Sequence, residues 1–251
     1  MTDAPDILAA NAARDFAKGL ASHWQVRLGD ALLGVYLIGS LAHGGFSRRY
    51  SDIDVAVVVE AGLTPADLDA MRADAAALSS ELAAKLSIFW TDRTFSAGRF
   101  PLLDRADYLD HGVALVERER IAPARPGLAE VRAYLTGKPF EAWSQGAAEF
   151  AALAAPTMLE PKSYKSYLRA HLYPARFAYS FMTGRVGSND TAVEWLKRRP
   201  LPGFHVPLIR AALDCRRAAA DPIALFPARD ALPRQVGACA ALVEESEAER
   251  P

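Results

Sequence analysis

Two aspartates, Asp52 and Asp54, stand two positions apart in the run DIDVAVVV, residues 52–59. The β-branched composition of this run predicts a strand. Because side chains alternate along a strand, both carboxylates leave one face, while Ile53 and Val55 pack on the other. Neighbouring carboxylates repel each other and become useful when a divalent cation bridges them, and Mg2+ is held by one or two carboxylates together with substrate phosphates. The pair therefore predicts a magnesium site that works on a phosphate-bearing ligand.

A second group of residues lies just upstream, in GSLAHGGFSRRYS. Gly39 and Ser40 directly follow the run VYLI, which predicts a buried strand. A glycine at this point lets the backbone approach a phosphate, and the N–H groups that follow can form an anion-binding concavity to which the Ser40 hydroxyl adds a donor. Arg48 and Arg49 are suited to neutralise triphosphate oxygens. Since phosphoryl and nucleotidyl transfer depend mainly on positioning and charge stabilisation, we expect these four residues to bind a nucleoside triphosphate.

Neither a DxD pair nor a GS pair is specific alone, but the order strand, GS, loop, DID, strand is far more so. This order resembles the signature of the nucleotidyltransferase superfamily that includes DNA polymerase beta. The stretch FAYSFMTGRVGSNDTAVEW, from Phe177 to Trp195, is similar to the helical domain of the streptomycin/spectinomycin (aminoglycoside) adenylyltransferases. The resemblance implies a magnesium-dependent adenylyltransferase that moves AMP from ATP to a hydroxyl of a small molecule of the aminoglycoside class, with a role in antibiotic resistance.

The resemblance also implies a third acidic residue on the next strand, which completes the metal site or acts as base toward the acceptor hydroxyl. The corresponding run LSIFWT, residues 86–91, contains no acid. Ser87 stands at the place of the acid, and Asp92 follows at the end of the run. We expect Asp92 to substitute, so that the catalytic set is Asp52, Asp54 and Asp92.

In the helical domain, the resemblance points to Asp190 and Glu194 as the groups that bind a cationic acceptor. Asp190 also stands in the first turn of a predicted helix, where it would stabilise the helix dipole without any ligand, so both roles stay open. The segment LDRADYLDHG, which holds Asp104, Asp107, Asp110 and His111, offers a candidate base but also matches an ordinary solvated helix that ends at Gly112, and we favour the solvated helix. His43, in the loop before the aspartate pair, is placed to face the nucleotide, but a lone histidine is more often merely exposed, and we expect it to be exposed.

The elements that must position these residues form an α+β chain. We expect a nucleotidyltransferase domain over residues 1–125, a small mixed sheet with flanking helices, and an α-helical substrate-binding bundle over residues 126–251. The first domain is predicted to contain a helix over about residues 7–28, the strands above and a helix that starts at Thr64-Pro65. The bundle is predicted to contain helices over about residues 140–154, 162–183, 191–199 and 206–219, and a last one that reaches Glu249. Pro174 should kink or split the second of these.

Net charge and the distribution of apolar residues limit the classes of partner that we expect. The formal net charge of −1 argues against a general nucleic-acid binder. No basic leader with an apolar block and no membrane-length apolar run is visible, so we expect a cytoplasmic protein without a membrane partner.

Two other functions stay open. Small proteins with the same GS…DxD signature adenylylate a tyrosine of a partner RNA-cleaving toxin, so a toxin–antitoxin-type protein adenylyltransferase is one alternative, although such proteins lack the helical domain. The missing acid in residues 86–91 motivates the other, a non-catalytic nucleotide-binding protein.

Overall fold

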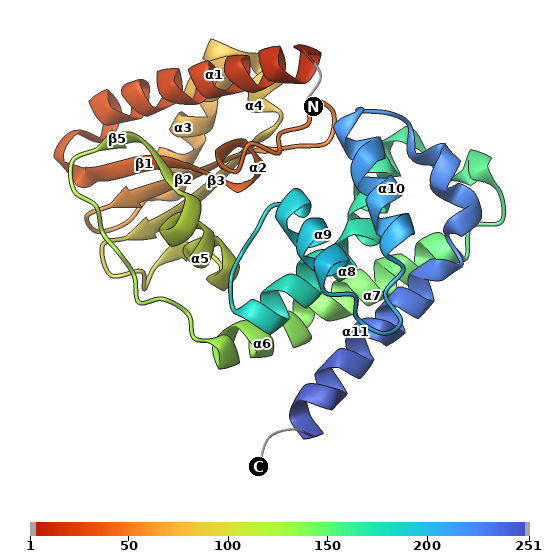
Figure 1. Cartoon of the computed structure of the whole chain (residues 1–251). Helices are drawn as coiled ribbons and strands as arrows, with labels where there is room; N and C mark the ends of the chain where they lie inside the picture. The colour runs from red at the N-terminus through yellow and green to blue at the C-terminus, as the bar shows by residue number, and fades with distance from the viewer. Residues whose placement is uncertain (1–3, 249–251) are drawn as a thin grey trace. The chain divides into compact units, whose positions relative to one another are not determined.

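The computed structural model describes residues 4–248, and Glu249, the expected end of the last helix, lies outside this range. The chain forms two compact units, Met1–Pro126 and Gly127–Pro251. The first is a sheet with helices and the second is helical throughout its described part, so the predicted α+β class is confirmed (Figure 1). Within residues 4–248, no helix combines the length and the apolar character needed to cross a membrane.

The N-terminal unit is built on a five-stranded mixed sheet in the order β4-β3-β2-β1-β5. Its strands are β1 (Leu32–Ile38), β2 (Ile53–Val59), β3 (Leu86–Asp92), β4 (Gly98–Arg99) and β5 (Val113–Glu117). Strand β1 runs antiparallel to both of its neighbours, β2 and β5, whereas the central strand β2 is parallel to β3. Strand β3 can run parallel to β2 because a helical crossover carries the chain back to the end of the sheet where β2 begins.

That crossover contains α3 (Pro65–Leu78) and the short α4 (Ser80–Ala83). The Thr64 side chain accepts the N–H of Asp67 and the Asp67 carboxylate accepts the N–H of Thr64, which makes a capping box, and Pro65 occupies the first turn. The helix start that the sequence predicts at Thr64-Pro65 is therefore confirmed.

Both faces of the sheet are covered. On one face α1 (Ala4–Leu28) and α3 pack on the strands, with Trp24 and Met71 fully buried among Val55 and Val57. On the other face α5 (Leu102–His111) brings Tyr108 against Tyr36 of β1, with ring centroids 4.9 Å apart. Alternate residues of β2 and β3 therefore belong to two separate cores, which assigns their side chains to the α1 face or the α5 face.

The C-terminal unit consists of helices joined by short turns. They are α6 (Leu128–Thr136), α7 (Lys138–Ala151), α8 (Tyr164–Thr183), α9 (Asn189–Arg198), α10 (Val206–Arg217) and α11 (Ala231–Ala248). The buried helix α8 packs against α6, α7, α9, α10 and α11. The nine-residue helix α6 precedes the first helix that the sequence predicts for the bundle, at about residue 140.

Pro174 does not split α8. Proline has no N–H, so the carbonyl four residues before it loses its usual helical donor. In this chain that carbonyl belongs to Ala170, and the indole Nε1–H of Trp143 on α7 donates to it at 3.0 Å. The neighbouring helix thus supplies the missing hydrogen bond within a buried contact, and the helix continues through the proline.

Candidate functional site

Asp54 lies in β2 and Asp52 immediately precedes it, and both are half-buried. The intervening Ile53 and the following Val55 are fully buried in the core on the α1 face, as the sequence predicts. Asp54 alternates with these residues and shares the α5 face with Ala56, which packs in the core that contains Tyr108.

The loop that leads to Asp52 is held in place from two sides. Arg14 of α1 donates to the Leu41 carbonyl at 3.2 Å. The buried Asp6, also on α1, accepts the backbone N–H of Arg48 at 3.1 Å, and the Lys85 ammonium donates to the Arg48 carbonyl. These contacts fix the loop backbone before the chain enters β2, so the aspartate pair is carried by an anchored segment.

Gly39 ends β1 and begins the short helix α2 (Gly39–Ala42), which also contains Ser40. Its φ of +66° lies in the left-handed region, where residues other than glycine are strained. A Cβ placed on Gly39 would lie 2.4 Å from Asp54 Oδ2. The Gly39 backbone therefore lies directly against Asp54, and only the absence of a side chain allows the approach.

The two arginines of the loop are both exposed. The Arg48 guanidinium lies 3.8 Å from the Asp6 carboxylate, and the Arg49 guanidinium lies over the Tyr50 ring at 5.3 Å from its centroid. The structure thus places both in the segment between α2 and β2, with side chains that solvent can reach.

Asp107 is a buried acid of α5 that the sequence assigned to a solvated helix. The residue is only 4% exposed. Its Oδ2 accepts the Gly39 N–H at 2.7 Å, and its Oδ1 lies 2.5 Å from His43 Nε2. His43, expected to be exposed, has a side chain that is 7% exposed. The signal available in the sequence was the spacing of Asp107 and His111, four residues apart and so on one face of a helix.

The register of β2 and β3 corrects the expectation for Asp92. Asp54 is aligned with Ser87, whereas Asp92 is aligned with Val59, five residues farther along. At about 3.3 Å per residue the separation along the strands is roughly 16 Å. Asp92 also alternates with Thr91 and so belongs to the α1 face, together with Trp90. Asp92 therefore does not join the pair, and Ser87 is the residue beside Asp54.

The Asp92 carboxylate has a structural role in the turn that follows β3. It accepts hydrogen bonds from the Thr94 hydroxyl at 2.7 Å, from the Ser96 hydroxyl and backbone N–H at 2.8 Å each, and from the Ala97 N–H at 3.2 Å. The Thr94 hydroxyl first, then the Ser96 and backbone donors, hold the pKa of this carboxyl well below its ordinary value. All of these donors favour the ionised form, which fits a turn-closing acid.

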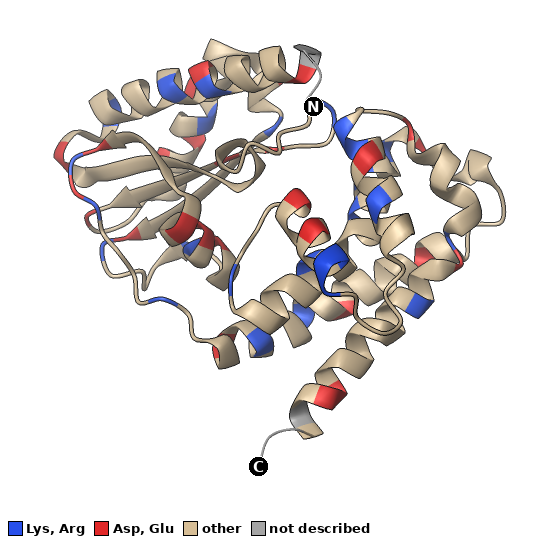
Figure 2. Cartoon of the chain, viewed as in Figure 1, with Lys and Arg blue, Asp and Glu red and all other residues tan. Residues whose placement is uncertain are grey.

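In the C-terminal unit, Asp190 and Glu194 lie on α9 as expected, but each is paired with an arginine of α10. Arg217 bonds to the Asp190 carboxylate, with one contact at 2.9 Å, and Arg210 donates to Glu194 at 2.8 Å. Asp214 pairs with both arginines. Acidic and basic residues therefore lie side by side on α9 and α10 (Figure 2), and Asp190 and Glu194 are each neutralised by an arginine.

Comparison with known proteins agrees with this architecture. No family profile matches the sequence, and no curated protein matches it. Among solved structures, spectinomycin adenyltransferase AAD(9) from Enterococcus faecialis, determined with ATP and spectinomycin, is similar, with a TM-score of 0.59. The similarity covers 89% of this chain and 99% of that chain at 14% sequence identity. The resemblance to aminoglycoside adenylyltransferases expected from the sequence is therefore found in the fold.

Proposed function

We propose that this chain is a nucleotidyltransferase that moves AMP from ATP to a hydroxyl group of a small molecule. The observation that carries the proposal is the contact between Gly39 and Asp54. This contact brings Gly39, the glycine expected to let a phosphate approach, next to Asp54 of the carboxylate pair, although 14 residues separate the two in the sequence. The adenylyltransferase fold supports the same assignment.

The donor set at the pair fits magnesium. Asp52 and Asp54 supply two carboxylates at the start of the central strand β2, both accessible in part. Mg2+ takes oxygen ligands from one or two carboxylates and completes its shell with substrate phosphates and water. Bound there, the ion would neutralise charge on the phosphates during transfer.

The chain's own residues would orient ATP around this centre. The absence of a side chain at Gly39 lets the triphosphate approach the backbone, the Ser40 hydroxyl adds a donor, and Arg48 and Arg49 bring positive charge from the anchored loop. We take the N-terminal unit as the nucleotidyltransferase domain and the C-terminal unit as the acceptor-binding domain.

Asp190 and Glu194 are the proposed acceptor-binding residues. Because Arg217 and Arg210 already pair with them, a cationic aminoglycoside would have to displace a guanidinium from each acid. An acceptor with hydroxyl groups and few positive charges suits these already paired acids better than a polycation does. Arg217→Ala should therefore tighten the binding of a cationic acceptor such as streptomycin, which calorimetry of acceptor binding would measure.

The direct test of the proposal is calorimetric titration of MgATP into Asp52→Ala and Asp54→Ala. Both variants should lose magnesium-dependent ATP binding while keeping the wild-type circular dichroism spectrum, because removing one of two repelling carboxylates costs the fold little. Asp69→Ala, which removes an exposed acid of α3 paired only with Arg72, is the matched control and should bind MgATP normally. Unchanged affinity in both pair variants would contradict the metal assignment.

A second candidate function rests on Ser87. Because the residue aligned with Asp54 carries no carboxylate, the site is also suited to a protein that binds nucleotide without transferring it. Mass spectrometry after incubation with MgATP, candidate small acceptors and candidate protein partners distinguishes the alternatives. A small-molecule adduct of AMP supports the first proposal, an AMP-modified protein supports toxin–antitoxin-type protein adenylylation, and ATP binding without any adduct supports the second candidate.

A further inference from the structure

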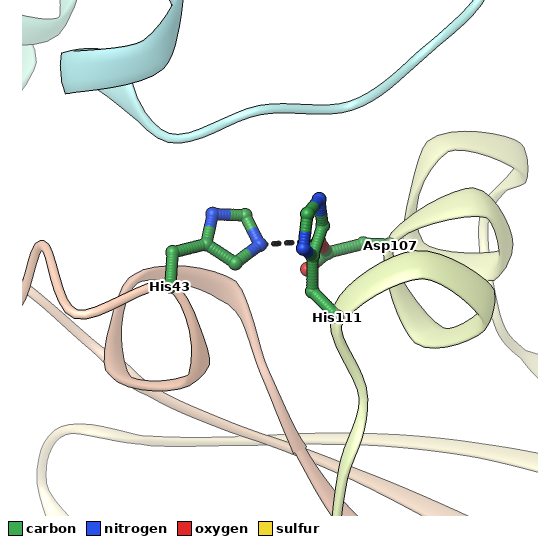
Figure 3. A group of neighbouring side chains, drawn as sticks. All are labelled: His43, Asp107 and His111. Atoms are coloured by element: carbon green, nitrogen blue, oxygen red, sulfur yellow. Dashed lines mark hydrogen bonds and ion pairs between the residues drawn. The ribbon is translucent and has the colours of Figure 1, made fainter.

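Three potential metal ligands converge where α2 meets α5. They are His43 at the end of α2, Asp107 within α5 and His111 at the last position of α5 (Figure 3). One ligand atom of each lies within 4.8 Å of the others. The His43 and His111 ring centroids are 4.4 Å apart with an interplanar angle of 61°, so the rings are not stacked face to face.

The donor types and spacing suit a borderline divalent cation. Imidazole nitrogen and carboxylate oxygen bind Zn2+ at about 2.0–2.2 Å, so ligand atoms around a tetrahedral ion are separated by roughly 3.3 Å. The 2.5 Å contact of His43 with Asp107 would open by under about 1 Å, and the widest of the three separations would close by at most about 1.5 Å. Side-chain rotation alone covers such changes.

The surroundings of Asp107 resemble those of a metal-ligating carboxylate. One oxygen, Oδ2, is held by the Gly39 N–H at 2.7 Å, which fixes the orientation of the group and leaves Oδ1 facing the histidines. Ligating carboxylates are commonly oriented by a hydrogen bond of this kind. His43 and Asp107 are nearly inaccessible, whereas His111 is exposed, so the cluster has one closed side and one side open to solvent.

We propose that His43, Asp107 and His111 form a binding site for a borderline divalent transition-metal cation, Zn2+ above all, with water at its open position. Three protein ligands and one open position is the arrangement of exchangeable and catalytic zinc sites rather than of closed structural ones. The site is separate in residues and in chemistry from the Asp52–Asp54 pair, which offers oxygen only.

A cation at this site would also affect nucleotide binding beside Gly39, the first residue of α2. Asp107 places a buried negative charge against the Gly39 N–H, where a triphosphate would meet repulsion. A cation held by Asp107 neutralises that charge and ties α2 to α5. Zinc and ATP should then each strengthen the binding of the other, by the same factor.

The test is a titration of the full chain with Zn2+ alone, followed by calorimetry, and with Co2+, whose visible absorption reports tetrahedral coordination. Wild-type protein should bind one zinc ion at this site. His111→Ala, which alters an exposed helix end, should weaken zinc binding by at least about tenfold, and Asp107→Asn should do the same while Asn can still accept the Gly39 N–H. His23→Ala, which removes an exposed histidine of α1, is the matched control and should bind zinc as the wild type does.

Asp54→Ala separates this proposal from the proposed function, since it should lose MgATP binding and retain zinc binding. Zinc binding that is equal in wild type, His111→Ala and Asp107→Asn would overturn the site, as would a wild-type protein that binds no zinc or shows no tetrahedral cobalt spectrum. Circular dichroism of each variant verifies the fold, and His111→Gln repeats the test with a more conservative change should His111→Ala unfold.

Discussion

Restoring a carboxylate beside Asp54 is the most informative single change in this chain. Ser87 is aligned with Asp54 in the parallel β2–β3 pair, so its side chain shares the face of Asp54 at an interstrand spacing of about 4.8 Å. Ser87→Glu would therefore create the third acid that the adenylyltransferase resemblance implies. With a base available, turnover should rise by about two to four orders of magnitude.

The same change should cost stability when no metal is bound. Two unit charges about 5 Å apart at an effective dielectric constant of about 20 repel by up to about 3 kcal/mol. Thermal unfolding of Ser87→Glu should begin at a lower temperature than that of the wild type without Mg2+, and added Mg2+ should recover most of the loss. The neutral, similarly sized Ser87→Gln is the control and should respond to Mg2+ as the wild type does.

The two assays are AMP transfer from α-labelled ATP to spectinomycin and streptomycin, with pyrophosphate release as the acceptor-independent readout, and thermal melting with and without Mg2+. Should Ser87→Glu melt like Ser87→Gln under both conditions, the alignment of residue 87 with the metal pair would be refuted. Should Mg2+ rescue the stability while turnover stays at the wild-type level, the alignment would stand and the transferase proposal would give way to nucleotide binding.

Three further predictions test neighbouring parts of the structure. Gly39→Val should abolish ATP binding and lower the free energy of unfolding by about 1–3 kcal/mol, because φ is +66° and the new Cβ would meet Asp54. Ser40→Ala should weaken ATP binding only modestly. Calorimetry measures the binding, and denaturant melts measure the stability. Asp92→Asn should leave ATP affinity and turnover unchanged and destabilise the N-terminal unit at neutral pH. Because the pKa of Asp92 is lower in the folded chain, its contribution to stability is complete above the unfolded pKa of about 4 and is lost as pH falls through the folded pKa. The melting temperatures of wild type and variant should therefore converge in acid. A difference that stays constant with pH would contradict this. Trp143→Phe should lower the free energy of unfolding by about 1–3 kcal/mol, because it leaves the Ala170 carbonyl without its donor. The loss should be smaller in a Pro174→Ala background, where residue 174 regains an N–H. Equal losses in both backgrounds would disprove the compensation.

The parts of the site that were predictable from sequence are those set by local pattern. The apolar run after Asp54 and the alternation along it determine a strand and its buried face, and Ile53 and Val55 are buried accordingly. The Thr64-Pro65 start of α3 follows from capping chemistry in four consecutive residues. In each case the physical cause lies within a few positions of the residue concerned.

What the sequence could not supply depends on packing between distant segments. Asp107 is buried because Tyr108 of α5 packs against Tyr36 of β1, a contact across 72 positions that no local periodicity encodes. The place of Asp92 depends on the register of two strands joined by a crossover, where a shift of one residue changes the face. Similarity of motif order pointed to the strand at residues 86–91, but it could not show that Asp92 lies five residues away from the level of Asp54.

The bond from Trp143 to the Ala170 carbonyl also limits the order in which this sequence can change over generations. A lineage that first replaces Trp143 leaves a buried carbonyl with no donor while Pro174 is still present. A lineage that first replaces Pro174 regains a donor within α8, after which position 143 is released from that requirement. The two routes reach the same final sequence, but only the route that loses the proline first avoids the destabilised intermediate, so selection for stability favours that order.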